Sequence, residues 1–207
     1  MKKISVFEFN KWENSIKKKD CFLDIGCWSG KKILELNKKC NVFGMDIDEK
    51  KLSLADNSIK DKLKYADATK KIPFNRKFDW ILLSEVAEHV DNDENLLKNI
   101  SNSLKINGFL ILTTPRSVKF FQIWDPAWVK WKFGGPKHYH YKFHELKTKL
   151  SKYGLEIEKY ATGGSFLWII SRWLGVFLKY ILRTNKQIDW RESDGFCDIK
   201  IIARKIK

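Results

Sequence analysis

The chain has 207 residues, a length that one compact domain with a sizeable buried core can fill. Its 43% of hydrophobic and 31% of charged residues are ordinary for a globular protein and exclude a long disordered chain. The formal net charge of +15 is compatible with binding to nucleic acid or to an anionic membrane, but Lys spread along the whole chain supplies most of it, as solvated helix faces would.

Apolar segments of strand length alternate with amphipathic segments of helix length. After an amphipathic helix at 6–18, we expect strands at 20–25, 41–46, 62–66, 78–84 and 107–114, separated by helices at 30–39, 49–58 and 91–105. Unbroken apolar runs, such as the one from Trp80 to Leu83, are typical of strands that are covered on both faces. The alternation predicts an α/β fold with a parallel, doubly wound sheet.

Two aromatic segments interrupt this alternation, at 116–140 and at 165–190. The first contains Phe120, Phe121, Trp124, Trp128 and Trp131. The remaining elements are a helix, a strand, a second helix and a last strand, expected at 143–153, 155–158, 165–183 and 196–202. Each aromatic segment follows a strand, so we expect both to be insertions at the ligand-binding edge of a single domain, with 116–140 as a lid.

A loop that contains glycines, Asp24-Ile25-Gly26-Cys27-Trp28-Ser29-Gly30, follows the first strand. Glycines let the backbone turn sharply and come close to a ligand. The second strand ends at Asp46, about sixteen residues after Gly30, where a carboxylate could accept hydrogen bonds from ribose hydroxyls. Together the two features indicate a site for a nucleotide-like ligand.

Three later segments complete a familiar pattern. They are Tyr65-Ala66-Asp67-Ala68 with Ile72-Pro73-Phe74, the stretch 78–90, and the stretch 104–115. With the first loop, they resemble class I methyltransferases that use S-adenosylmethionine (SAM), of the branch that holds the ubiquinone-biosynthesis O-methyltransferases. The likeness covers about residues 20 to 160. It implies a Rossmann-like sheet of seven strands in the order 3-2-1-4-5-7-6, with the last strand antiparallel.

The same resemblance implies which residues contact SAM: Asp24, Gly26, Cys27, Trp28, Gly30, Asp46, Ile47, Asp67, Ala68 and Ser84. Trp28 departs from the family pattern, which usually has a glycine there. If the backbone needs a positive φ at this position, tryptophan costs on the order of 1 kcal/mol or more. Trp28 is therefore also the sequence support for an alternative, a domain that binds SAM without catalysing transfer.

Glu85, Glu88 and His89 follow the fourth strand at a spacing of i, i+3 and i+4, which would place them on one face of a helical turn. Oxygen and imidazole ligands suit magnesium, manganese or zinc. The pattern is similar to the metal-binding motif of ubiquinone-type O-methyltransferases and of small-RNA 2′-O-methyltransferases, which implies a metal that holds a substrate hydroxyl. The alternative leaves both acids solvated or bonded to the backbone beside the cofactor.

Three of the four histidines, His138, His140 and His144, lie within seven residues. In the resembling families a histidine in this region faces the active site. We therefore expect His138 or His140 to act, with His89, as a catalytic base or a further metal ligand, and His144 to lie on a helix surface. The alternative is ordinary loop histidines beside aromatic neighbours.

The segment 165–183 is amphipathic. At 100° per residue its polar and basic positions fall within an arc of about 120° and leave a wide apolar face. Arg172 and Lys179 would each cost roughly 2.5 to 3.5 kcal/mol at a bilayer centre, which argues against a membrane span. We expect the helix either to lie in the interface of an anionic membrane or to pack on the domain or on a second subunit, as in a homodimer.

The sequence thus predicts a transferase that methylates a hydroxyl of a small-molecule or lipid-linked acceptor. RNA is the alternative acceptor, although no appended RNA-binding domain is recognised. The four cysteines show no paired CxxC spacing, and the first residues lack the apolar core of a signal peptide. We therefore expect a cytoplasmic protein, with membrane association, where it occurs, at the inner face.

Overall fold

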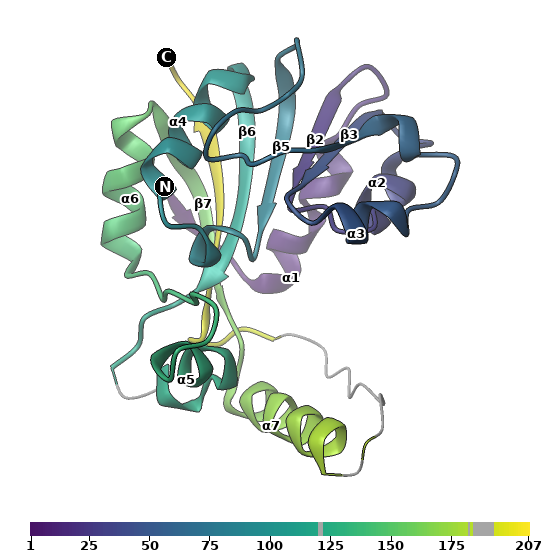
Figure 1. Cartoon of the computed structure of the whole chain (residues 1–207). Coiled ribbons are helices and arrows are strands. Elements are labelled where there is room, and N and C mark those ends of the chain that lie inside the picture. The colour runs from purple at the N-terminus through teal and green to yellow at the C-terminus, as the bar shows by residue number, and fades with distance from the viewer. Residues whose placement is uncertain (120–121, 182, 184–192) are drawn as a thin grey trace.

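The computed structural model describes residues 1–119, 122–181, 183 and 193–207, and it contains one mixed β-sheet (Figure 1). Eight strands form this sheet in the described part of the chain. In chain order they are β1 (Lys2–Lys3), β2 (Cys21–Ile25), β3 (Asn41–Asp46), β4 (Leu63–Tyr65), β5 (Phe78–Ser84), β6 (Leu104–Pro115), β7 (Leu155–Gly163) and β8 (Asp198–Lys205).

The spatial order of the strands is β1-β7-β8-β6-β5-β2-β3-β4. Strand β8 pairs antiparallel with β6 and β7, whereas the other pairs are parallel. Strands β2 to β8 therefore confirm the predicted order and the antiparallel last strand. The additional edge strand β1, which pairs with β7, was not predicted, because two lysines carry no hydrophobic pattern.

Helices cover both faces of the sheet. Neighbouring strand residues point to opposite faces, so Phe22 and Leu82 enter one core layer, and Leu23 and Leu83 enter the other. The first layer is closed by α1 (Val6–Phe9), the 3-10 helix η1 (Asn10–Ser15) and α2 (Lys31–Leu36), and the second by α4 (Asp93–Ser103) and α6 (Phe143–Lys152). α3 (Glu49–Ser53) and η2 (Lys60–Lys62) connect β3 to β4.

Several element boundaries differ from the sequence expectation. The helix expected at 6–18 is α-helical only to Phe9 and continues as a 3-10 helix. The helix expected to reach residue 105 ends at Ser103, because Leu104 already pairs with Phe78 as the first residue of β6. The last strand runs over Asp198–Lys205 instead of 196–202. These shifts leave the carboxyl ends of the central strands where they were expected.

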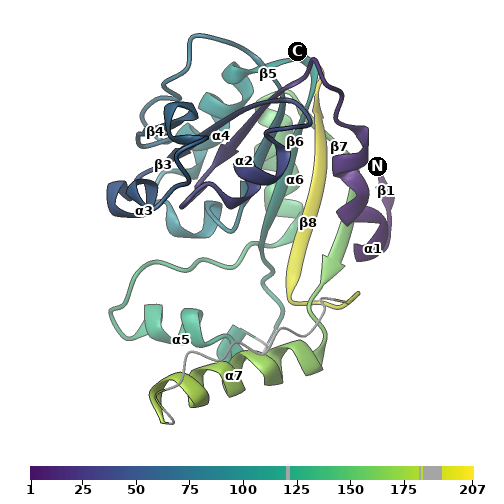
Figure 2. The ribbon, with the colours of Figure 1, turned by 90° about the vertical axis from the view of Figure 1, so that its right-hand side faces the viewer.

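The two aromatic insertions lie below the carboxyl edge of the sheet. The first contains η4 (Gln122–Trp124) and α5 (Pro126–Lys132), and the second contains α7 (Phe166–Tyr180). Figures 1 and 2 show α5 and α7 side by side at this edge. Phe120 and Phe121 of the expected lid, and most of 181–190, lie outside the described residues. Among the helices that the structure describes, none is both long and apolar enough to cross a bilayer.

Candidate functional site

The loop after β2 folds over the end of β3. The backbone N–H groups of Gly26 and Cys27 both donate to the carbonyl of Met45, at 2.8 and 3.1 Å. Gly26 has φ +77°, and a Cβ placed there would lie 2.3 Å from Cγ2 of Val86. Both the backbone conformation and the available space therefore require glycine at this position. The predicted nucleotide loop lies against the turn that follows β5.

Trp28 adopts the positive φ that the sequence analysis considered, at +54°. Its backbone N–H donates to Oδ2 of Asp46 at 2.8 Å, and this charge-assisted hydrogen bond offsets the conformational cost. The indole is 59% exposed, and Nζ of Lys51 lies 4.6 Å from its ring centre. The other Asp46 oxygen accepts from the backbone N–H of Asp48 at 2.8 Å. Asp46 therefore holds the loop in place at the position predicted for the ribose.

Asp24 and Cys27 are buried beneath this loop. Desolvation raises the pKa of Asp24 to about 7; Lys32 opposes the shift and Asp46 adds to it. Burial also raises the pKa of the Cys27 thiol, which is packed close to Gly44. The thiol is therefore a neutral packing group. The Asp24 carboxyl, in contrast, favours a cationic ligand group, and SAM carries an ammonium and a sulfonium.

In the absence of ligand, the variant Asp24→Asn is expected to be more stable than the wild type, and this difference in the free energy of unfolding should be larger at pH 8 than at pH 5. Because burial raises the pKa of Asp24 from its ordinary 3.8 to about 7, the wild-type free energy of unfolding falls as the pH rises between these values. Asparagine has no charge to bury, so the difference should widen by about 2 to 3 kcal/mol between the two pH values. Chemical unfolding of both proteins measures it, and a constant difference would contradict the raised pKa.

The other residues predicted to contact SAM lie along the same edge. Asp67 accepts from the backbone N–H and the hydroxyl of Thr69, at 2.9 and 2.7 Å, and the hydroxyl bond lowers its pKa. The side chain of Ala68 is buried in the core, and its carbonyl accepts from Asn99 at 2.9 Å. Ile47 is exposed after β3, and Gly30, with φ +77°, is the N-cap of α2.

The turn after β5 differs from the expected single helical face. Glu85 has φ +55°, and the 3-10 helix η3 (Ala87–His89) begins only after it. The carboxylate of Glu85 accepts from the hydroxyl of Thr113 at 2.8 Å, and the Thr113 hydroxyl is also 2.8 Å from the hydroxyl of Ser84. The left-handed conformation at Glu85 therefore leaves the backbone of this residue outside the helical turn, and the expected placement of Glu85, Glu88 and His89 on one helical face is wrong.

Glu88 is completely buried beside His89. Its Oε2 accepts from the hydroxyl of Thr114 at 3.2 Å, whereas Oε1 has no hydrogen-bond partner among the described residues. Nε2 of His89 is 3.8 Å from that free oxygen. Burial, followed by the charge of Glu85, raises the pKa of Glu88 to about 9, and a hydrogen bond between the Glu85 and Glu88 side chains adds to this shift. Burial of a carboxyl oxygen that has no partner destabilises the fold unless a cation or a hydrogen-bond donor contacts it.

The segment that begins at Lys137 lies alongside η3. The backbone N–H of Tyr139 donates to the carbonyl of Glu88 at 3.0 Å, and the carbonyl of Lys137 is 2.7 Å from Nδ1 of His89. Because a carbonyl can only accept, Nδ1 of His89 must carry the hydrogen, which leaves a lone pair on Nε2. His138 is thereby brought to the Glu88 side chain.

Asp125 holds both buried histidines. Its Oδ2 is 3.0 Å from Nε2 of His138 and 3.0 Å from Nε2 of His140, while its Oδ1 accepts from the N–H of Ala127 as the N-cap of α5. Nδ1 of each histidine is buried without a hydrogen-bond partner in the described part of the chain. The sequence analysis missed Asp125; it is the one acidic residue between 116 and 144, which was the available signal. His144 is exposed on α6, as expected.

Two sets of three side chains each bring one ligand atom per residue to within 4.8 Å of the others: Glu88 with His89 and His138, and Asp125 with His138 and His140. In the first set, a hydrogen bond to Thr114, Lys137 or Asp125 fixes one atom of each side chain and leaves a second atom free. This is how proteins orient metal ligands, and one carboxylate with two imidazoles suits a divalent cation. We call this set the Glu88 cluster; Glu85 is not part of it.

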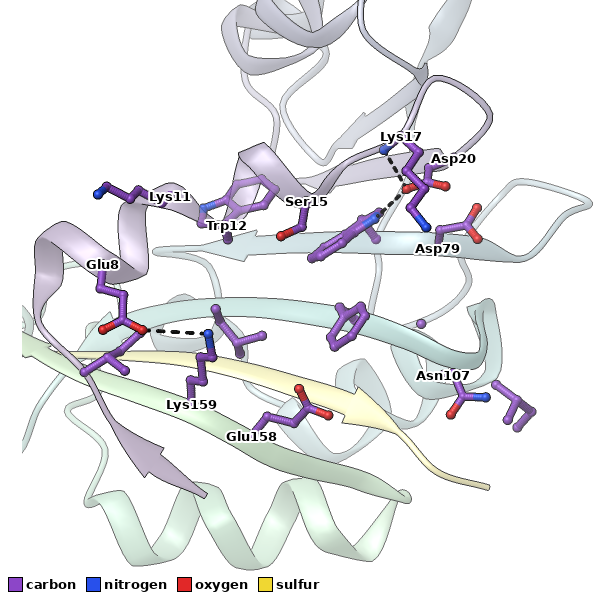
Figure 3. A pocket seen from close by; sticks show the side chains of 16 residues that line it. Glu8, Lys11, Trp12, Ser15, Lys17, Asp20, Asp79, Asn107, Glu158 and Lys159 are labelled. Atoms are coloured by element: carbon purple, nitrogen blue, oxygen red, sulfur yellow. Dashed lines mark hydrogen bonds and ion pairs between the residues drawn. The ribbon is translucent and has the colours of Figure 1, made fainter.

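A groove of about 690 Å³ lies away from this edge, between η1 and the amino-terminal parts of β5 and β6 (Figure 3). Three of its charged groups already have partners: Glu8 is 3.8 Å from Lys159, and the Asp20 carboxylate accepts from the backbone N–H of Lys17 and from the indole N–H of Trp80. In open α/β sheets the ligand lies beyond the carboxyl ends of the strands. The groove is therefore not the site, despite its volume.

Comparison with known proteins agrees with this geometry. A family model described as a methyltransferase domain matches residues 7–160. The chain is 33% identical over 102 residues to a mitochondrial ubiquinone biosynthesis O-methyltransferase of Candida albicans, covering 44% of this chain and 31% of that protein. A ubiquinone biosynthesis O-methyltransferase of Rickettsia canadensis is 27% identical over 148 residues, covering 66% of this chain and 63% of the relative. The chain thus spans less than two thirds of the length of these relatives.

Solved structures match over nearly the whole chain. A protein from Bacillus halodurans has a TM-score of 0.68 at 18% identity, covering 97% of this chain and 100% of that chain. A SAM-dependent methyltransferase from Archaeoglobus fulgidus has a TM-score of 0.67 at 17% identity, and the match covers 96% of this chain and 92% of that chain. At these identities the likeness shows a shared fold.

Proposed function

Because the chain belongs to the methyltransferase domain family and is a class I SAM-dependent methyltransferase, we propose that it transfers the methyl group of SAM to a hydroxyl oxygen of a small-molecule or lipid-linked acceptor. The relatives named O-methyltransferases support oxygen as the receiving atom. The observation that carries the proposal is the Glu88 cluster, in which each side chain brings one ligand atom to within 4.8 Å of the others.

The loop after β2 and Asp46 are the proposed SAM site. Asp46 lies at the position predicted for the ribose, the buried Asp24 favours the cationic end of SAM, and Asp67 is one of the residues that the resemblance predicts to contact SAM. Gly26 and Val86 join this loop to the turn that carries Glu88. The methyl group would then be presented close to the Glu88 cluster, which is the requirement for in-line transfer.

The Glu88 cluster fits a divalent metal, because Oε1 of Glu88 and Nδ1 of His138 are buried atoms without a hydrogen bond among the described residues. Glu88, His89 and His138 would hold such an ion, as magnesium, manganese or zinc. When bound, a divalent ion places positive charge beside a hydroxyl and lowers the pKa of that hydroxyl.

In the proposed reaction the acceptor oxygen attacks the methyl carbon, the bond from that carbon to sulfur breaks, and S-adenosylhomocysteine leaves. The hydroxyl proton needs a base. His140 is the candidate, because its Nε2–H is held by Asp125 while its Nδ1 is left with a lone pair. This arrangement of histidine and carboxylate keeps the imidazole in one orientation and stabilises the imidazolium that forms.

The test supplies the protein with isotope-labelled SAM and a panel of a phenol, a catechol, a sugar and RNA, and analyses the products by mass spectrometry. The expected result is an O-methyl ether on a non-nucleic-acid hydroxyl, formed by the protein with manganese and lost with a chelator. Methylation confined to nitrogen or to RNA would refute the proposed acceptor. Full activity of the metal-free protein would refute the proposed requirement for a metal ion.

The variant Asp125→Asn is expected to weaken manganese binding by about 10-fold to 100-fold, because a neutral amide no longer fixes the orientation and basicity of His138. Isothermal titration measures the affinity. Helix α5 should keep its N-cap, since asparagine caps as well as aspartate. Asp61→Asn, an exposed aspartate on η2, is the matched control and should bind manganese like the wild type. An unchanged affinity in Asp125→Asn would contradict the assigned role.

A further inference from the structure

Helix α7 presents apolar side chains to solvent along one face. Six of them are between 37% and 60% exposed: Phe166, Leu167, Ile170, Trp173, Leu174 and Phe177. At 100° per residue they fall within about 120° of arc. Ile169 and Ser171, which lie outside that arc, are buried. A soluble domain rarely leaves so large a continuous apolar face uncovered, so we expect a partner to cover it.

The exposed face of α7 continues onto the lid. The indole N–H of Trp173 donates to the carbonyl of Trp124 at 2.6 Å, and an apolar groove of about 370 Å³ lies between η4 and α7. Trp124 and Ile169 line this groove and also a small cavity that reaches Asp125 and His140. The apolar surface therefore leads from the outside of the molecule toward the proposed reaction site.

In the described part of the chain, the charged residues of α5 and α7 are of one sign. Neither α5 nor α7 contains an acidic residue, and the adjacent Asp125 is engaged by two histidines. Lys130 and Lys132 are exposed in the last turn of α5, and Arg183 is exposed three residues after the end of α7. Apolar and aromatic side chains with a basic border match the interface of an anionic bilayer, where the rings lie at headgroup level and the cations meet lipid phosphates.

We propose that the exposed face of α7, together with η4 and α5, docks on the surface of an anionic lipid membrane. A second copy of the chain fits this face less well, because an isologous contact would bring the same basic border against itself. Docking would turn the carboxyl edge of the sheet, with the Glu88 cluster, toward the lipid surface (Figures 1 and 2). This inference rests on neither the metal nor the identity of the acceptor.

The test measures co-sedimentation of the full chain with vesicles of equal parts phosphatidylcholine and phosphatidylglycerol, compared with phosphatidylcholine alone. We expect binding to the anionic vesicles only, weakening as salt is added. Leu174→Glu with Phe177→Glu should reduce binding about tenfold or more, because two apolar side chains are lost and two anions are gained. The matched control is Phe7→Glu with Ile106→Glu, which adds the same charges at exposed apolar positions away from α7.

Circular dichroism and SAM binding are measured on both double variants to verify folding. Wild-type protein that fails to bind anionic vesicles would overturn the proposal, as would equal losses in the two double variants. If the wild type binds no vesicles but forms a concentration-dependent dimer, and only the α7 double variant is monomeric, the face would be assigned to a second copy of the chain instead. Because vesicle binding is measured without an acceptor, its failure is distinct from a failure of methyl transfer.

Discussion

Glu88→Gln is expected to reduce methyl transfer by about 100-fold or more and to abolish detectable manganese binding, because the Glu88 cluster then loses its only anion. Glutamine has the same shape and leaves the acceptor for Thr114 in place. Burial raises the pKa of Glu88 to about 9, so the ion must displace a proton, and wild-type affinity should rise with pH up to that value. Calorimetric titration across this pH range and turnover assays with labelled SAM measure both effects.

Glu85→Gln is the matched comparison. Glu85 lies outside the Glu88 cluster and bonds to Thr113, so its variant should keep most of the affinity for manganese. Equal losses in the two variants would restore the set predicted from sequence spacing. A stability measurement separates a folding defect from a defect in ligand binding. Because the pKa of Glu88 is raised in the folded protein, the free energy of unfolding of the wild type falls as the pH rises from about 4.5 to about 9. Glu88→Gln should therefore be at least as stable as the wild type near pH 8.

Gly26→Ala is expected to destabilise the protein by about 2 to 5 kcal/mol and to weaken SAM binding strongly. A methyl group at φ +77° costs about 1 to 2 kcal/mol, and its approach to 2.3 Å from Val86 adds the cost of overpacking. The loop must then shift away from Met45 and Asp46, which position it. Thermal unfolding with and without SAM measures both effects.

Two further variants separate conformational strain from the steric clash. Gly134 has φ +87° but nothing within 4 Å of an added Cβ, so Gly134→Ala should cost only about 1 kcal/mol. Shortening the partner in the double variant Gly26→Ala, Val86→Ala should recover part of the lost stability. If Gly26→Ala and Gly134→Ala cost the same, the contact between Gly26 and Val86 is not what fixes the loop.

The sheet could be predicted from the sequence because its signals are local. Runs such as Trp80 to Leu83 are long, apolar and flanked by turns, and the family pattern orders them. Glycine and acid spacing placed the loop after β2 and Asp46 at one edge for the same reason. The short β1 and the early start of β6 at Leu104 were missed, because strand pairing decides them and the residues themselves do not.

The ligand set could be predicted only in part. Glu88 and His89 are neighbours in the sequence, so their spacing was informative. Whether Glu85 or His138 is the third member of the cluster depends on the left-handed backbone at Glu85 and on a hydrogen bond between Tyr139 and Glu88, which are about fifty residues apart. Asp125 was missed because its role needs the folded lid. Local periodicity cannot report contacts that arise only when two distant segments meet.

Asp125 has one further consequence, because a single carboxylate serves two structures. One oxygen begins helix α5, and the other orients His138 and His140. At the proposed metal site, any contact that orders α5 should therefore strengthen ion binding by the histidines, and a bound ion should order α5 by the same free energy, since such coupling is reciprocal. We therefore expect an ordered α5 and a loaded metal site to occur together more often than either occurs alone.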